Sequence, residues 1–96
     1  MPEKNKSSNE LILVNIMEEI VRPRVKTTQK DLGACTCETC YLNACALALN
    51  ALRPKYVTTE KGALFVKITE TELAQSVTIL FEVTKAVLQV KEHPCH

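Results

Sequence analysis

The sequence contains no tryptophan, only two tyrosines and two phenylalanines, and only two glycines among its 96 residues. It also has no surplus of either charge, because twelve Lys and Arg side chains stand against eleven Asp and Glu side chains, for a net charge of +1. A protein that neutralises many phosphates needs a basic surface. The charge balance therefore argues against general nucleic-acid binding and leaves room only for anion binding at one local spot.

Long hydrophobic runs are missing as well. No segment is apolar enough over the length that spans a bilayer, and the polar start MPEKNKSSNE lacks the features of an export signal. We therefore expect a cytoplasmic protein without a membrane span. In a reducing compartment, five cysteines are expected to bind metal, to react or to be buried, and an odd count fits a disulfide framework poorly.

Catalytic motifs are absent from the sequence. It contains no glycine-rich phosphate loop, no HExxH or GxSxG motif and no paired catalytic carboxylates; Glu18-Glu19 reads as a solvated helix face. We expect a protein that is not an enzyme.

The composition is that of one small globular domain, with 46% apolar and 24% charged residues. Residues 1–8 read as a flexible tail, and residues 9–96 as a single domain. A chain this short buries a smaller share of its surface than a larger domain, so a covalent or metal staple, or a partner subunit, is expected.

Periodicity predicts a mainly α fold with three helices. In Glu10–Arg22 the apolar residues recur at helical spacing until Pro23, which should end or kink the helix. Val25–Ala34 has no clean period and is expected to include a connecting loop, in which Gly33 supplies an unusual backbone angle. Cys40–Leu52 is apolar on nearly every face, which predicts a central helix with one side available to another subunit.

The second half of the chain contains both strand-like and helix-like patterns. Tyr56–Thr59 favours a strand, and Glu60–Gly62 is expected to form a turn. Residues 63–69 (ALFVKIT) fit either a strand or a loop that leads into a helix. Glu70–Glu92 has near-helical spacing and predicts the third helix, which Pro94 closes.

Three cysteines at C-x-C-x-x-C spacing, Cys35, Cys37 and Cys40, predict a metal site. Zinc takes four thiolate or imidazole ligands in a tetrahedron, and Cys40 would lie in the first turn of a helix, whose dipole favours the thiolate. The natural fourth ligand is Cys95, with His93 and His96 as substitutes. Four such ligands leave no open position, so the site would be structural.

Two other interpretations of the cysteines stay open. Cys37 and Cys40 fit a thioredoxin-like redox pair, although the βαβ context of such pairs is not evident, and the clustered thiols could also be packing residues. Cys45, on the apolar helix, is expected to be a buried core thiol rather than a ligand.

The stretch from the first cysteine onward, C-x-C-x-x-C followed by ALALNALRPKYVTT, resembles the signature of the ComFB late-competence-development family. The resemblance implies a small, mostly helical, cytosolic homodimer with a zinc site made by Cys35, Cys37, Cys40 and Cys95. It also implies a link to competence and, as in some members, binding of cyclic dinucleotides. The chain departs from the family pattern where an acid, a leucine and a proline are usual, at Asn43, Cys45 and Arg53.

Three functions follow from these observations. The first is a non-catalytic receptor for cyclic di-AMP or cyclic di-GMP, with Arg53 and Lys55 pairing with phosphate and Tyr56 stacking on a base. Against this, the two cations could be merely solvated and Tyr56 part of the core. The second is a zinc-stapled interaction module that binds a protein partner in a competence assembly. The third is a thiol redox protein.

Overall fold

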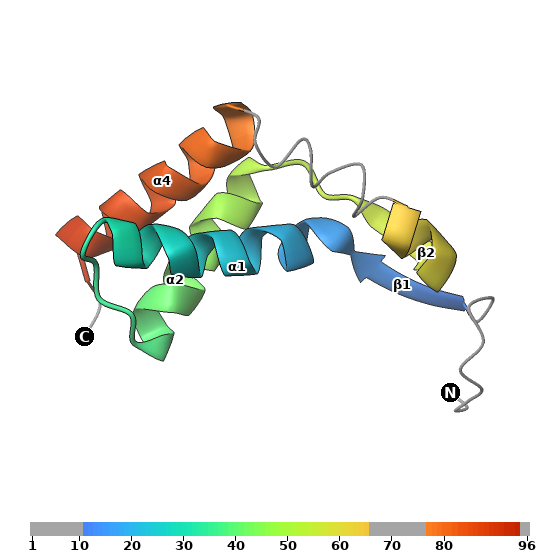
Figure 1. The fold of residues 1–96 in the computed structure, drawn as a ribbon, viewed down its shortest axis with the longest axis horizontal. Helices are drawn as coiled ribbons and strands as arrows, with labels where there is room; N and C mark the ends of the chain where they lie inside the picture. Colours follow the sequence, from blue (N-terminus) through green and yellow to red (C-terminus); the bar gives the residue numbers. More distant parts are fainter. Residues whose placement is uncertain (1–10, 66–76, 95–96) are drawn as a thin grey trace.

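The computed structural model describes residues 11–65 and 77–94. Three helices within these ranges, α1 (Ile16–Asp31), α2 (Glu38–Ala51) and α4 (Val77–Glu92), pack against one another. An antiparallel ribbon of β1 (Leu11–Asn15) and β2 (Tyr56–Thr59) extends from the start of α1, away from the other two helices (Figure 1). The expected mainly helical fold is confirmed.

The core lies where the three helices meet, and each helix contacts the other two. Ala44, Cys45 and Ala48 of α2 are buried in this core, while Leu42 and Leu47 on the same helix are exposed. The fully buried residues with the largest side chains come from all three helices: Ile16, Val21, Val25, Val83, Val87 and Cys40. No helix in the described ranges is long and apolar enough to cross a membrane.

The first helix begins later than predicted. Residues 11–15 form a strand, because Asn15 starts α1 as its N-cap and accepts a hydrogen bond from the Met17 amide (3.1 Å). The same Asn15 Oδ1 accepts a second bond from the Lys55 amide (2.8 Å), and the Ile16 amide donates to the Lys55 carbonyl (2.7 Å). These contacts join residues forty positions apart, so local periodicity carries no signal of them.

Pro23 lies inside α1, so the prediction that the helix ends there is wrong. The segment Val25–Ala34, which was expected to include a loop, is helical as far as Asp31. Proline removes one backbone donor from a helix interior at a cost of about 3 kcal/mol. Pro23 lies on the exposed face, while Val21 and Val25 on either side are completely buried. The packing of Val21 and Val25 in the core therefore outweighs the cost of proline within the helix.

The predicted strand at Tyr56–Thr59 is confirmed, and it pairs with β1 in the register Val14 with Val57 and Asn15 with Tyr56. The turn expected at Glu60–Gly62 is wrong, because residues 60–65 are helical. Thr59 caps this segment, since its hydroxyl accepts a bond from the Gly62 amide (2.9 Å). Residues 63–65 are therefore helical and not a strand, and residues 66–69 lie outside the described ranges.

The third predicted helix is confirmed as α4 over Val77–Glu92. Its expected beginning at residues 70–76 lies outside the described residues. The helix ends two residues before Pro94. The C-terminal end of α4 lies near the loop that joins α1 to α2 (Figure 1).

Candidate metal centre

The loop that carries the cysteines starts at a tight helix end. Gly33 adopts a positive φ of 65°, a region that glycine enters without steric cost. The Gly33 amide donates to the Lys30 carbonyl (3.2 Å), and the Ala34 amide donates to the Gln29 carbonyl (2.9 Å). This is the Schellman pattern of a helix C-terminus. It reverses the chain and confirms the unusual backbone angle predicted at Gly33.

A buried glutamine holds the loop in place. The Gln29 side chain is only 2% exposed, and its Nε2 donates a hydrogen bond to the Cys35 carbonyl (2.9 Å). The sequence interpretation missed this residue because it fell within the expected loop. A signal was present, since Val21, Val25 and Gln29 follow one another at intervals of four and form one buried stripe of α1.

Cys37 and Cys40 are positioned by the start of α2. Cys37 is the N-cap, and its Sγ accepts a hydrogen bond from the Cys40 amide (3.5 Å). Cys40 is the third residue of the helix and is 1% exposed, whereas Cys37 and Cys35 are exposed. The predicted place of Cys40 in the first helical turn is confirmed, with the helix starting two residues earlier than expected.

The three thiols lie together. The Sγ atoms of Cys35, Cys37 and Cys40 are all within 4.8 Å of one another. Sulfur ligands about 2.3 Å from a tetrahedral zinc ion are about 3.8 Å apart, so small rotations of these side chains would bring them to one ion. Three soft donors on one loop and helix start therefore fit a thiolate-binding metal such as zinc.

The thiols differ in proton affinity. The hydrogen bond from the Cys40 amide lowers the pKa of the Cys37 thiol. Cys37 therefore ionises more readily than Cys40. Burial, and then the neighbouring Cys37 and Cys35 thiols, raise the pKa of Cys40 to about 12. A bound cation reverses such a shift, because a coordinating thiol is deprotonated outright. Without a metal, the Cys40 thiol is protonated at neutral pH.

The C-terminal end of α4 borders the cluster. Cys35 and Cys40 line a small cavity of about 70 Å³ together with Val90, Lys91 and Pro94. The expected fourth ligand, Cys95, and its alternative His96 lie outside the described residues. His93 is described but is not part of the thiol group; it lines a separate hollow.

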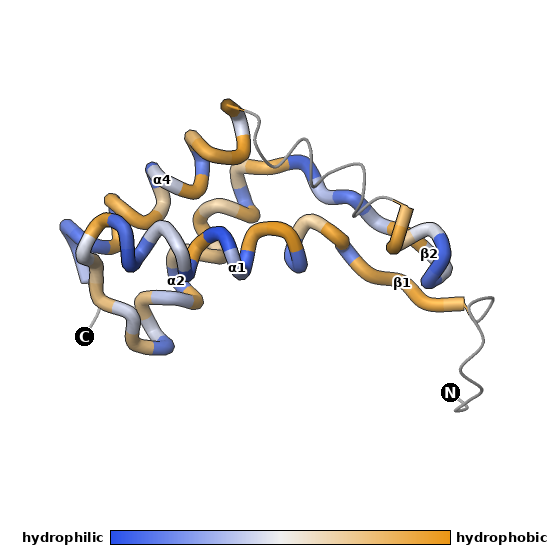
Figure 2. The backbone as a smooth tube through the Cα atoms, in the orientation of Figure 1, coloured by the Kyte–Doolittle hydropathy of each residue, from blue (hydrophilic) through white to orange (hydrophobic). Residues whose placement is uncertain are grey.

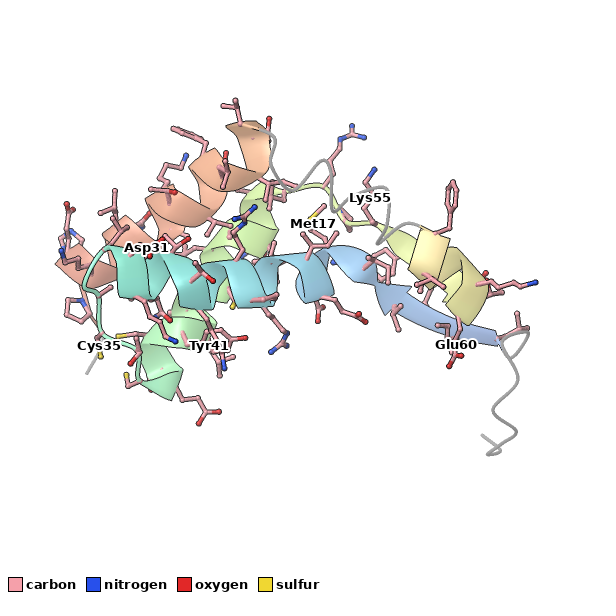
Figure 3. The ribbon with its side chains drawn as sticks, viewed as in Figure 1. Met17, Asp31, Cys35, Tyr41, Lys55 and Glu60 are labelled. Atoms are coloured by element: carbon pink, nitrogen blue, oxygen red, sulfur yellow. The ribbon has the colours of Figure 1, made fainter. Side chains whose placement is uncertain are left out.

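The remaining predicted residues lie elsewhere. Cys45 is 4% exposed among the core side chains, as expected for a packing thiol. Arg53, Lys55 and Tyr56 are all exposed, and Tyr56, at 62%, is not a core residue. Figure 3 shows Cys35 and Lys55 near opposite ends of α1. The structure therefore separates the cysteine cluster from the predicted ligand-binding turn.

The family model of the late competence development protein ComFB matches residues 14–94. The chain belongs to the ComFB family. The late competence protein ComFB from Bacillus subtilis has a solved structure that superposes on this ComFB-family chain with a TM-score of 0.71 and 30% sequence identity. The match covers 88% of this chain and 93% of the Bacillus chain. No curated protein sequence matches significantly.

Proposed function

We propose that Cys35, Cys37, Cys40 and Cys95 hold one structural zinc ion in this protein. The observation that carries the proposal is the group of three thiols within 4.8 Å. Pro94 supports the fourth ligand, because it lines the same cavity as Cys35 and Cys40 and directly precedes Cys95. Four protein ligands would close the site and leave no position for a substrate.

Metal analysis of the purified protein tests this proposal, with one zinc per chain expected. Alkylation of the native protein separates it from thiol redox chemistry. Thiolates bound to zinc should react only after a chelator is added, whereas a redox pair at Cys37 and Cys40 should react at once. A metal-free protein with promptly reactive thiols would rule out the zinc site.

Around this site, we propose a non-catalytic regulatory protein that acts as a cyclic-dinucleotide receptor in competence or DNA uptake. The turn of Arg53, Pro54, Lys55 and Tyr56 supports a ligand site, because its side chains are exposed next to one another. Guanidinium and ammonium groups pair with phosphate, and an exposed ring can stack on a base. The turn is also held in shape, since Asn15 binds the Lys55 amide.

Calorimetric titration with cyclic di-AMP and cyclic di-GMP tests the receptor proposal. Binding of either ligand should weaken in Arg53→Ala and Tyr56→Ala, while Lys85→Ala, a change to an exposed cation on α4, should leave it unchanged. No heat and no thermal shift with either nucleotide would refute this function for the protein.

A second candidate is a zinc-stapled interaction module that forms a homodimer and binds a protein partner without a small ligand. Exposed apolar side chains support it. Leu11 and Leu13 on β1 are mostly exposed, and so are Leu64 and Phe65 in the helical segment beyond β2; Figure 2 shows β1 as a largely hydrophobic strand. A two-stranded ribbon is marginally stable alone, so a subunit covering this end would stabilise it.

Sedimentation velocity tests the dimer. The native protein should sediment as a dimer, and Leu13→Asp should shift it toward the monomer. A native protein that stays monomeric at high concentration would exclude the homodimer.

A further inference from the structure

A groove of about 470 Å³ runs between α1 and the beginning of α2. Its volume lies within the range of small-ligand sites in proteins. The groove is distinct from the cavity beside the thiols, although Gln29 lines both, and it does not include the exposed Arg53 turn. Its lining residues come from α1, from the cysteine loop and from α2: Lys26, Gln29, Lys30, Thr36, Glu38 and Tyr41.

Cations line one wall of the groove. Lys26 and Lys30 lie four residues apart on α1 and both line the groove; Arg22, one turn earlier on the same face, is not a lining residue. In the described parts of the chain, neither lysine forms an ion pair with a carboxylate. Arg22 has a weak pair with Glu18 at 3.8 Å, with both side chains half exposed. The two lysines therefore remain available to an anion.

Tyr41 forms the opposite wall and contacts one of these cations. The Lys26 Nζ lies 5.1 Å from the centre of the Tyr41 ring. Figure 3 shows Tyr41 between α1 and α2. Lys26 is thus held against the ring that lines the other side of the groove.

We propose that the α1–α2 groove binds a small phosphate ester. Lys26 and Lys30 would contact the phosphate, and the Thr36 hydroxyl offers a further hydrogen bond. Glu38 is the one carboxylate among the lining residues, so it favours a ligand whose organic part carries hydroxyl or amino donors. Such a ligand combines a phosphate with a sugar or a nucleoside.

This proposal does not depend on the receptor function proposed for the Arg53 turn. The Ile16 end of α1 is bonded to Lys55, and Lys26 lies ten residues further along the helix. At a rise of 1.5 Å per residue, the two places are about 15 Å apart along α1. Titrations can therefore distinguish them by which backbone amides respond.

The test is a titration of the ¹⁵N-labelled, metal-loaded full chain with adenosine 5′-monophosphate, ribose 5-phosphate and adenosine, at constant ionic strength. Both phosphate esters should shift the amide signals of residues 26–30 and 36–41, and adenosine should not. The amide signals of Arg53, Lys55 and Tyr56 should stay in place with adenosine 5′-monophosphate, whether or not cyclic dinucleotides bind there.

Variants make the test specific. Lys26→Ala and Lys30→Ala should each weaken binding by about tenfold, the equivalent of about 1.4 kcal/mol. Lys85→Ala is the matched control, because the Lys85 Nζ lies 4.9 Å from the centre of the Phe81 ring, outside the groove. All three lysines are exposed, so their replacement should leave the fold intact. Absent shifts, equal shifts with adenosine, or equal losses in Lys85→Ala would each overturn the proposal.

Discussion

Gln29 offers the sharpest test of how the helices support the metal centre. Its amide group holds the Cys35 carbonyl at 2.9 Å from a fully buried position. The change Gln29→Met keeps the length of the side chain, adds little volume and removes the hydrogen-bond donor. The Cys35 carbonyl would then lose its partner, a loss of about 1–3 kcal/mol where no water replaces it.

Zinc affinity should change more in Gln29→Met than the free energy of unfolding does. Burial of a thioether in place of an amide offsets part of the lost stability, whereas nothing restores the position of Cys35. Residues that orient metal ligands typically change metal affinity 10–100-fold, which corresponds to about 1.4–2.7 kcal/mol. Because Gln29 acts on the backbone of Cys35 and not on its sulfur, we expect a loss of about tenfold, near the lower end.

Competition with a chromophoric zinc chelator measures this loss, and urea unfolding with and without zinc measures the stability. The matched control is Gln89→Met, the same replacement at an exposed position of α4. Zinc affinity should fall in Gln29→Met and stay unchanged in the control. Wild-type zinc affinity in Gln29→Met would refute the role given to this side chain.

Three further outcomes are expected. Cys40→Ser should lower the melting temperature far more than Cys45→Ser, because structural zinc supplies on the order of 10 kcal/mol of apparent binding energy in small domains; equal melting temperatures in calorimetry would count against a structural metal. Zinc affinity should fall as the pH falls, because the pKa of Cys40 is about 12 without metal and its proton must leave on binding; a pH-independent affinity in chelator competition would contradict this. Asn15→Ala should destabilise the protein to urea by about 1–2 kcal/mol through loss of the α1 cap, whereas Asn50→Ala, exposed on α2, should have little effect.

Local sequence patterns correctly predicted the features that depend on neighbouring residues alone or that have a clear apolar pattern. Cys40–Leu52 is apolar on most sides, and all of it except the capping residue Leu52 lies in the helix α2. The unusual backbone angle predicted at Gly33 is observed, because few other residues enter the left-handed region easily. The C-x-C-x-x-C spacing brought three thiols together because a capping turn and one helical turn suffice to do so.

The wrong predictions share a different cause. Residues 11–15 have apolar spacing that suits a helix, but they pair with β2, a segment more than forty residues away along the chain. Pro23 and the stretch after it look like a helix end, yet the buried stripe of Val21, Val25 and Gln29 continues through them. In each case a long-range contact outweighs a local preference, and no local rule contains that information.

Two amide side chains show how these long-range contacts organise the molecule. Asn15 at the start of α1 binds the backbone of Lys55, and Gln29 near its end binds the backbone of Cys35. One helix thus fixes both the exposed turn and the cysteine loop, and it holds them at opposite ends. Thr36 and Glu38 belong to the metal-bearing segment and also line the α1–α2 groove. Loss of metal should therefore disturb the groove directly, while the Arg53 turn, held by Asn15, is affected only through the shared core.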